Sequence, residues 1–499
     1  MAEKGKTRRV IVSNRLPISL VKERGRWRVQ ASAGGLVTAL APVLRNQGGV
    51  WIGWPGAMEG AAQQRVLDRE MDNLGYRMVG VSLTLEELDL YYFGFSNEII
   101  WPLFHGLQSL CNYDPRYWNA YQEVNRKFAQ VITSEITRGD FLWVHDYQLM
   151  WVGCALRELG VMGPVGFFLH IPFPPMDIFH KLPWRRQILE GLLGFDLVGF
   201  QTNRHKRNFL QCVRAMIPDV TVMGQGPVST VRFQDREIRV GYFPIGIDFE
   251  SFDHLARETE MQEEAQALKF ALRNRTTILG VDRLDYTKGI PYKLDAIRNA
   301  LGRYPELRYN INFLQVLVPS RETIPQYEEL RREIEHLVGQ INGEFSEPGW
   351  VPVQYIYRSL SRRELVAYYR ASEIALITPL EDGMNLVAKE YCAASHDGHG
   401  VLILSEFAGA AAQLSRDALM VNPYDREGVA DAVAQAFHMQ ADERAGRMAR
   451  LRRNVQGQDV FRWVTSFLQT GQAREPGPLR RMGEATGDDQ DEYWLDITG

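Results

Sequence analysis

The sequence predicts an α/β protein with two domains, each built on a parallel sheet with helices on its faces. The chain has 499 residues, which is more than one hydrophobic core usually holds. Short apolar runs alternate with longer amphipathic segments, a pattern typical of parallel sheets. The second half repeats this rhythm without repeating the sequence itself.

The first half holds five apolar runs of strand length, followed or separated by helical patterns. The predicted strands are Val10–Ser13, Gly49–Ile52, Phe141–His145, Val165–His170 and Leu197–Phe200. Amphipathic periodicity predicts helices over 148–159 and 203–215. The pair Gly34-Gly35 precedes a further predicted helix, at 36–44, and there the backbone could approach a phosphate or sugar. A simple turn is nearly as good an interpretation.

The second half contains four more strand-like runs. They are Thr277–Val281, Asn310–Val316, Ile374–Thr378 and Val401–Leu404. The junction between the domains is expected at residues 242–248, where an apolar strand meets Pro and Gly before an acidic stretch. We therefore predict an N-terminal domain over 1–245 and a C-terminal domain over 246–454.

Composition excludes several classes of protein. A net charge of −4 gives no general attraction to nucleic acid or to an anionic membrane. No apolar run could span a bilayer, and the first residues lack the apolar core of a signal peptide. The four cysteines show no C-x-x-C spacing and are interpreted as buried, reduced thiols. We expect a cytoplasmic protein, and the sequence leaves open whether it forms a homo-oligomer.

Residues 378–390 carry the first indication of chemistry. An apolar strand turns at Asp382-Gly383 and continues into helix-forming residues. The start of a helix offers free N–H groups and the positive end of its dipole, which suit a phosphate. Glu390 lies one turn past Leu386, so its carboxylate could accept hydrogen bonds from a ribose diol. An ordinary strand–turn–helix connection is the alternative.

A second segment of this kind ends an earlier strand. Residues 277–289 bring Arg283 and Lys288 into one loop, flanked by Asp285 and closed by Gly289. A planar guanidinium and a movable ammonium suit a pyrophosphate whose charge grows as its bond breaks. A surface salt-bridge loop would have the same composition. Together the two segments favour a site for a nucleotide diphosphate.

These two segments resemble trehalose-6-phosphate synthases, a family of retaining glycosyltransferases with the GT-B fold. The motifs are G-V-D-R-L-D-Y-T-K-G at 280–289 and T-P-L-E-D-G-M-N-L-V-A-K-E-Y at 378–391, and the likeness runs from about residue 10 to 425. The resemblance implies two Rossmann-like domains facing each other across a cleft. It also implies that helices at about 455–470 cross back onto the N-terminal domain. The stretch 472–499 is expected to be a mobile tail.

The same resemblance implies transfer of glucose from a nucleotide-diphospho-glucose, with UDP-glucose as the expected donor, to glucose 6-phosphate. The acceptor pocket would lie in the N-terminal domain. Arg15 would bind the acceptor phosphate together with Arg321, and Tyr92 and Trp101 would contact the sugar. An internal ion pair for Arg15 and core packing for the aromatic residues are the structural alternatives.

The resemblance also assigns residues to the donor and to the reaction. Asp146 would orient hydroxyls and His170 would hold the donor glucose, while the leaving phosphate takes the acceptor's proton. Arg283 and Lys288 would neutralise the pyrophosphate. The remaining donor contacts would come from Gly35, Asp382, the amides of Leu386 and Val387, and Glu390. Gln201 is a further candidate for lining the cleft.

We predict no cofactor and no essential metal, because no cluster has metal-ligand spacing. One departure from the family's pattern occurs at 411–414 (A-A-Q-L), where a polar or acidic residue usually precedes the leucine. Because this segment is expected to begin a helix close to the donor site, the sequence leaves the base of the donor nucleotide open. Two alternatives stay open: another phosphorylated acceptor such as glycerol 3-phosphate, and a catalytically silent sugar-phosphate sensor. A nicotinamide-dependent oxidoreductase is disfavoured by the missing G-x-G-x-x-G fingerprint.

Overall fold

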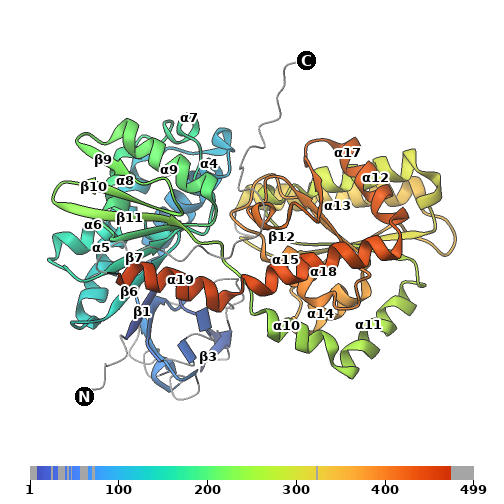
Figure 1. Cartoon of the computed structure of the whole chain (residues 1–499), viewed down its shortest axis with the longest axis horizontal. Helices are drawn as coiled ribbons and strands as arrows, with labels where there is room; N and C mark the ends of the chain where they lie inside the picture. The colour runs from blue at the N-terminus through green and yellow to red at the C-terminus, as the bar shows by residue number, and fades with distance from the viewer. Residues whose placement is uncertain are drawn as a thin grey trace.

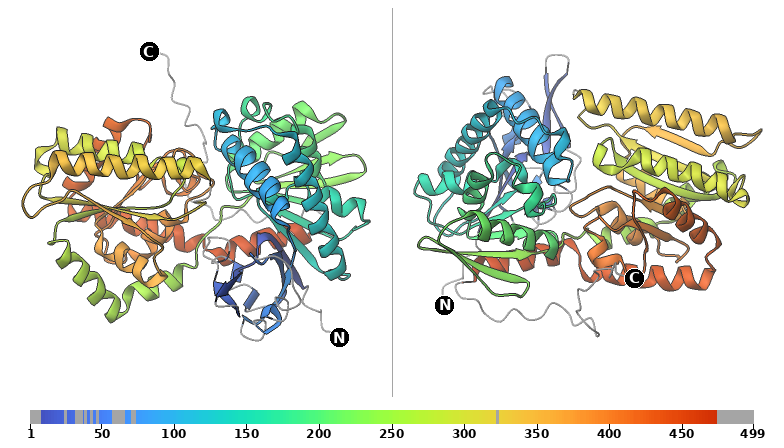
Figure 2. Two further views of the ribbon diagram at one scale, coloured as in Figure 1. Left: turned by 180° about the vertical axis from the view of Figure 1, so that it is seen from behind. Right: turned by 90° about the horizontal axis from the view of Figure 1, so that it is seen from above.

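The computed structural model describes residues 8–23, 26–31, 37, 40–41, 44–45, 48–56, 66–69, 74–321 and 324–473. Within these residues two large sheets form two α/β domains that lie side by side (Figures 1 and 2). The first sheet has the order β5-β4-β1-β6-β7-β8-β11-β10-β9, and the second has the order β14-β13-β12-β15-β16-β17. The predicted fold class, two Rossmann-like domains of the GT-B type, is confirmed. Residues 474–499, which include nearly all of the predicted tail, lie outside the described residues.

The five strands predicted for the first half agree with the structure to within a few residues: β1 (Arg9–Arg15), β4 (Val50–Trp54), β6 (Phe141–His145), β7 (Val165–Phe168) and β8 (Leu197–Phe200). The sheet also contains β5 (Arg77–Gly80), which was not predicted, and β9 (Val220–Met223), β10 (Val228–Phe233) and β11 (Arg236–Tyr242). Strand β7 ends two residues earlier than predicted, and the N–H of His170 donates to the Asp146 carboxylate instead of to a strand. The antiparallel strands β9 and β10 were not predicted, because their burial alternates and their apolar runs are short.

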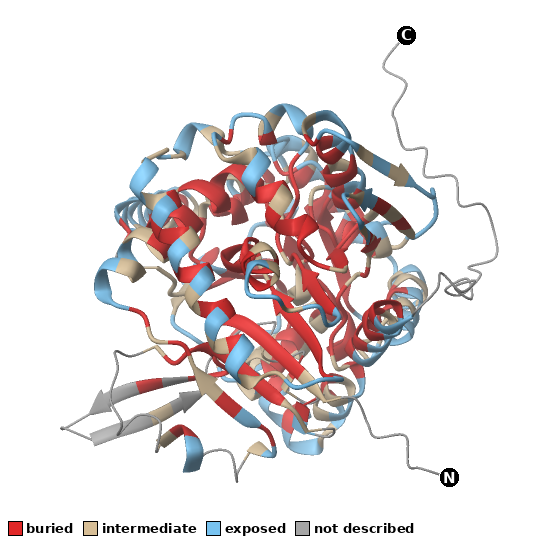
Figure 3. Cartoon of the chain, turned by 90° about the vertical axis from the view of Figure 1, so that its left-hand side faces the viewer, coloured by how far each residue is buried: buried red, intermediate tan, exposed pale blue. Residues whose placement is uncertain are grey.

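Helices cover both faces of this sheet. The main ones are α5 (Pro115–Glu135), α6 (Val152–Glu158), α8 (Arg185–Leu193) and α9 (Asn203–Met216). Apart from this sheet, β2 (Ile18–Glu23) and β3 (Arg26–Ala31) form a two-stranded hairpin. The predicted helix at 203–215 is confirmed. The one predicted at 148–159 is divided into a short turn, η3 (Tyr147–Leu149), and α6. Viewed from the N-terminal side, buried strands lie beneath helices whose outer faces are exposed (Figure 3).

The second sheet is parallel throughout. Its strands are β12 (Thr276–Arg283), β13 (Ile311–Val318), β14 (Val353–Tyr357), β15 (Ile374–Ile377), β16 (Val401–Ser405) and β17 (Leu419–Val421). Its helices are α10 (Phe249–Arg257), α11 (Thr259–Ala271), α12 (Ile290–Arg303), α13 (Pro325–Phe345), α14 (Arg362–Ala371), α15 (Leu386–Ala394), α16 (Ala411–Leu414) and α17 (Arg426–His438). The near-continuous apolar strands reflect burial on both faces.

The chain passes between the domains twice. Residues 243–248 lead from β11 to α10, and α18 (Ala441–Gly457) on the C-terminal domain is followed by α19 (Val460–Gln472) on the N-terminal sheet (Figure 1). The ring of Phe467 stacks on Trp143 with centroids 4.4 Å apart. A Cβ at Gly166 or Gly199 would come within 2.8 Å of the Phe467 ring, so these glycines allow α19 to approach the sheet.

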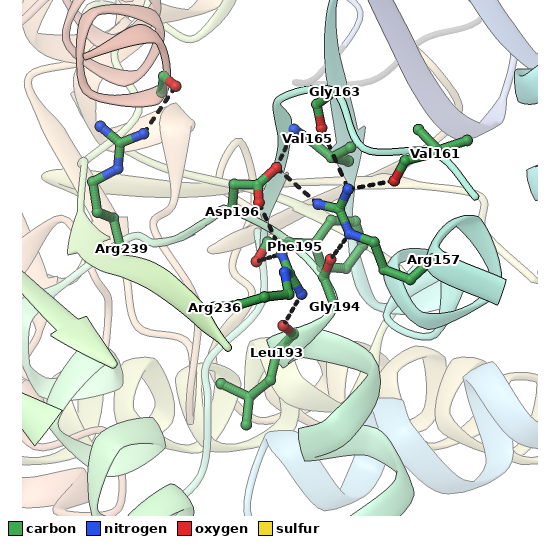
Figure 4. A network of polar contacts seen from close by, with 11 residues as sticks. Arg157, Val161, Gly163, Val165, Leu193, Gly194, Phe195, Asp196, Arg236 and Arg239 are labelled. Carbon is green, nitrogen blue, oxygen red and sulfur yellow. Dashed lines mark hydrogen bonds and ion pairs between the residues drawn. The ribbon is translucent and has the colours of Figure 1, made fainter. Parts of the chain in front are cut away.

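Arginines of the N-terminal domain fasten this helix and the loops around it (Figure 4). Arg239 donates to the carbonyls of Gly471 and Ala473 at the end of α19, at 3.0 and 2.8 Å. Cationic groups suit a helix C-terminus because the last carbonyls have no partner within the helix. Nearby, Asp196 accepts from Arg157 and Arg236, both at 2.8 Å. These contacts are structural and lie apart from the candidate site.

All four cysteines are free, as predicted, but they are not all buried. Cys212 and Cys392 are buried, whereas Cys111 and Cys154 are half-buried. Burial raises the pKa of the Cys212 and Cys392 thiols to about 12, which makes them poor nucleophiles. In the described part of the chain, the helices are too short or too polar to cross a membrane.

Candidate active site

The predicted site residues lie where parallel strands end. Arg15 is the last residue of β1 and Arg283 the last of β12, while Asp146 directly follows β6. In doubly wound sheets, functional groups collect at this carboxyl edge. Several side-chain contacts join the edges of the two domains: Trp101 Nε1 donates to Asp285 Oδ1 at 3.4 Å, Arg321 Nη2 donates to the Tyr147 hydroxyl at 3.1 Å, and Arg204 forms an ion pair with Glu381.

On the C-terminal side, Lys288 and Asp382 form an ion pair with 2.5 Å between Nζ and Oδ2. Both side chains are mostly buried, at 11% and 15% exposed. Burial opposes ionisation of Asp382, but the ammonium and its hydrogen bond outweigh it and hold the pKa of the carboxyl below its usual range. The resemblance implies separate roles for these two residues, whereas in the structure each is the other's partner.

Helix α15 begins beside this pair. Its N-cap residue, Asn385, has the strained backbone angle φ = 77° and accepts a hydrogen bond from the N–H of Ala388 at 3.2 Å. The N–H groups of Leu386 and Val387 come before Ala388 and have no acceptor within the helix. One turn later, Glu390 accepts from the Tyr369 hydroxyl at 2.8 Å, and burial raises the pKa of this carboxyl.

The turn at Gly383 packs directly against the N-terminal domain. A Cβ on Gly383 would lie 2.0 Å from the carbonyl oxygen of His170, and one on Gly409 would lie 1.9 Å from the carbonyl of Gly383. Three backbone segments are therefore in contact, and neither glycine can be replaced without moving one of them. This contact places the Asp382 loop against the residue that follows β7.

On the N-terminal side, arginines converge on one tyrosine. The Arg15 guanidinium lies 5.8 Å from the ring centroid of Tyr92 and 4.7 Å from that of Trp54. Burial raises the pKa of Tyr92, but the positive charges of Arg321, Arg15 and Arg283 outweigh it and leave the pKa below its usual value. Three guanidinium groups around one phenol form an electropositive region suited to an anion.

A π-helix brings Tyr92 and Trp101 together. The segment η1 (Leu88–Ile100) is π-helical, and the N–H of Trp101 bonds to the carbonyl of Ser96, five residues back. A π-helix has roughly 4.4 residues per turn, so positions nine apart lie on one face, whereas in an α-helix they would lie on opposite faces. Accordingly, Arg321 lies 4.3 Å from the Trp101 ring and also interacts with Tyr92.

Asp146 has the most unusual backbone of the candidate residues. Its φ of 76° and ψ of 169° fall in a region that is essentially reserved for glycine, and such a conformation costs about 1–3 kcal/mol. Its carboxylate accepts from the N–H of His170 at 3.2 Å. Burial raises the pKa of this carboxyl to about 6, although the positive charges of Arg283 and Arg321 act in the opposite direction.

His170 is held in its neutral form. Its Nε2 lies 3.1 Å from Nδ1 of His145. Burial lowers the pKa of His170 to about 3 and holds the pKa of His145 well below its usual value. A histidine with so low a pKa is a weak base at neutral pH. Gln201, the further candidate for lining the cleft, is buried, and its amide nitrogen lies 3.5 Å from Nδ1 of His170.

The structure adds site residues that the sequence did not single out for a role. Tyr147 and Tyr327 hydroxyls both bind Arg321, and Asp285 lies 3.7 Å from its guanidinium. Tyr147 directly follows Asp146 at the same sheet edge, so its position in the sequence was a signal that it belongs to the site. Gly35 lies outside the described residues. Among the described residues, no group of three or more His, Cys, Asp or Glu side chains is placed to hold a metal ion.

Two parallel-sheet domains, with cations and a helix start at their adjoining edges, define the class of glycosyltransferases with the GT-B fold. Comparison with known proteins narrows this class. The model of glycosyltransferase family 20 matches residues 7–472, and the chain belongs to that family.

Similar proteins share one description. The trehalose-6-phosphate synthase of Mycolicibacterium gilvum is 44% identical over 476 residues, 94% of each chain. That of Mycobacterium tuberculosis is 44% identical over 468 residues, 92% of this chain and 93% of that one. A crystal structure of a UDP-forming synthase from Burkholderia xenovorans, in complex with glucose-6-phosphate, is 34% identical with a TM-score of 0.84, covering 93% of this chain and 100% of that chain. An E. coli structure bound with UDP-2-fluoro glucose is also 34% identical, with a TM-score of 0.82 and coverage of 94% and 99%.

Proposed function

We propose that the protein is a trehalose-6-phosphate synthase. It transfers glucose from UDP-glucose to glucose 6-phosphate and forms α,α-trehalose 6-phosphate and UDP. The observation that carries this proposal is the pair of anion-binding regions at the adjoining edges of the two domains: Arg15 and Arg321 beside Tyr92, and Lys288 beside the start of α15. Two phosphorylated substrates need two such regions. The similar structures with glucose-6-phosphate or UDP-2-fluoro glucose bound support the assignment of these two substrates.

The donor binds to the C-terminal domain. Arg283 and Lys288 neutralise the pyrophosphate, and the amides of Leu386 and Val387 hydrogen-bond to it at the positive end of α15. Glu390 holds the ribose. Lys288 is already paired with Asp382, so the pyrophosphate shares the ammonium with this carboxylate, and Asp382 stays ionised to accept hydrogen bonds from the donor glucose.

The acceptor binds to the N-terminal domain. Arg15 and Arg321 bind its phosphate, and Tyr92 and Trp101 contact its ring. Arg321 comes from the loop after β13 in the C-terminal domain, so the acceptor pocket contains residues of both domains. A sugar phosphate offers an apolar ring face and a dianion, and the aromatic and cationic groups match these two parts.

Transfer with retention needs no protein base. The C1–O bond to the UDP phosphate breaks, the acceptor oxygen bonds to C1 on the same face, and the acceptor proton moves to the departing phosphate oxygen. Arg283 and Lys288 stabilise the charge that develops on that phosphate. His170, neutral and weakly basic, holds the donor glucose, and Asp146 orients hydroxyl groups. We propose that these cations make an essential metal unnecessary.

The proposal is tested by nucleotide release over a matrix of UDP-, ADP- and GDP-glucose against glucose 6-phosphate, glycerol 3-phosphate and glucose. We expect the fastest release of UDP with glucose 6-phosphate, and trehalose 6-phosphate as the product. Preference for glycerol 3-phosphate would show that the same donor chemistry serves another acceptor. Binding of both glucose 6-phosphate and glycerol 3-phosphate, without release of nucleotide from any donor, would indicate a catalytically silent sensor.

A further inference from the structure

A buried lysine lies outside the substrate-binding set. Lys389 is 1% exposed, and its ammonium donates to the carbonyl of Ile245 at 2.7 Å and to Oε1 of Gln413 at 2.6 Å. Within the described residues, no carboxylate forms an ion pair with it. A buried cation without a carboxylate partner is costly, and burial accordingly lowers the pKa of Lys389 to about 7. Packing alone would be served better by an apolar side chain.

The first partner of Lys389 lies in the linker between the domains. Ile245 belongs to residues 243–248, between β11 and α10. Its N–H donates to Gln201 Oε1 at 3.0 Å, while its carbonyl accepts from Lys389. Gln201 follows β8 in the N-terminal domain and Lys389 lies on α15 in the C-terminal domain. One linker residue is therefore bonded by both domains.

The second partner reaches the other linker. The Gln413 amide donates to the side chain of Gln458, at the end of α18. A Cβ on Gly246 would lie 2.3 Å from the Gln458 carbonyl, and the N–H of Val460 donates to the carbonyl of Ile247 at 3.0 Å. The two linkers therefore cross in contact, and Lys389 is hydrogen-bonded to one directly and to the other through Gln413.

Lys389 also belongs to the donor helix. It precedes Glu390 and follows Leu386 and Val387 on α15. We propose that Lys389 is a positioning residue that couples both interdomain linkers to the donor-binding helix, so that a change in the angle between the domains moves the donor groups. The kinetic consequence rests on the proposed function, whereas the mechanical coupling does not. The unusual sequence at 411–414 therefore acts on the linkers through Gln413.

The test compares two buried lysines given the same substitution. Lys389→Met removes the coupling. Lys206→Met is the matched control, because Lys206 is 2% exposed and donates to the carbonyl of Gly226 within one domain. Amide hydrogen exchange is measured by mass spectrometry on the full chain. We expect Lys389→Met to speed exchange at least tenfold in residues 243–248 and 456–460 and in the first turn of α15 together, and Lys206→Met to leave all three unchanged.

Kinetics supply the second readout. With saturating UDP-glucose and glucose 6-phosphate, we expect kcat of Lys389→Met to fall at least tenfold, while the Kd of UDP changes less than threefold. Unchanged exchange in the linkers, or a kcat equal to that of Lys206→Met, would overturn the coupling.

If Lys389→Met does not fold, Gln413→Leu takes its place. We then expect faster exchange at 456–460, and unchanged exchange there would contradict the proposal. Absence of UDP release by the unmodified enzyme would instead refute the proposed function, and the exchange result would still stand.

Discussion

The two halves of the candidate site are built in different ways. The donor half comes from two continuous motifs that follow neighbouring strands, β12 and β15, and its Lys288–Asp382 pair lies within one domain. The acceptor half is gathered from a strand end (Arg15), a π-helix (Tyr92) and a loop of the opposite domain (Arg321). The cations, the helix start and Glu390 of the donor half therefore lie in one domain, with His170 added from the other, whereas the acceptor phosphate site depends on how the two domains sit against each other.

This difference predicts that donor-side substitutions act on the chemical step, while acceptor-side substitutions act on substrate choice. The largest effect is expected for Lys288→Ala. It removes charge stabilisation from the transition state and should lower turnover by about two to four orders of magnitude.

UDP release at saturating donor and acceptor measures this effect, and a thermal melt shows whether the variant is folded. Arg283→Ala should behave similarly. Because Asp382 loses its partner in Lys288→Ala, the double variant Lys288→Ala/Asp382→Asn is a useful control for the unpaired carboxylate. Near-wild-type turnover of folded Lys288→Ala would remove this residue from the reaction.

The next largest effect is expected for Arg15→Ala. A charge-assisted contact to phosphate is worth about 1.5–3 kcal/mol, so kcat/KM for glucose 6-phosphate should fall about ten- to a hundredfold. Donor affinity should change little, and unphosphorylated glucose, a poor acceptor for either enzyme, should lose little more. Equal proportional losses for both acceptors would make Arg15 a structural residue at the end of β1.

A smaller effect is expected from pH, through Asp146. Its pKa of about 6 means that the carboxylate is protonated as the pH falls through 6, and kcat/KM should be about tenfold lower one pH unit below that value.

The contribution of Asp146 to the stability of the fold should change with pH in the opposite direction. Because the folded pKa is raised, the native state binds the proton more readily than the unfolded chain between about pH 4 and 6, so this group's contribution to stability grows on acidification. In the variant Asp146→Asn, the fall of kcat/KM on the acidic side of the pH profile should disappear. If that fall persists in the variant, it belongs to another titrating group.

The smallest effect is expected from chelation. If Arg283 and Lys288 supply the charge stabilisation that a metal ion supplies in other transferases, EDTA should leave turnover unchanged at constant ionic strength. Complete loss of activity that Mg²⁺ or Mn²⁺ restores would contradict this assignment.

The sequence predicted the donor half better than the acceptor half for a physical reason. Arg283, Lys288 and Asp382 belong to short segments in which strand, turn and helix start can be read locally. The π-helix could not be read in this way, because it depends on packing: a Cβ on Gly94 would lie 2.6 Å from the Tyr117 ring of α5. The place of Arg321 followed only from resemblance, since no local pattern shows which loops of two domains meet.

The way α19 lies on the N-terminal sheet sets the order in which the molecule can be completed. Chains are synthesised from the N-terminus, and domains commonly fold as they emerge. Here the aromatic surface around Trp143 and Phe168 stays open to water until Trp463 and Phe467 have been made. Closing contacts between residues so distant in sequence is slow. The domain synthesised first is therefore the last to be finished, and it waits for the C-terminal domain that lies between its two parts along the chain.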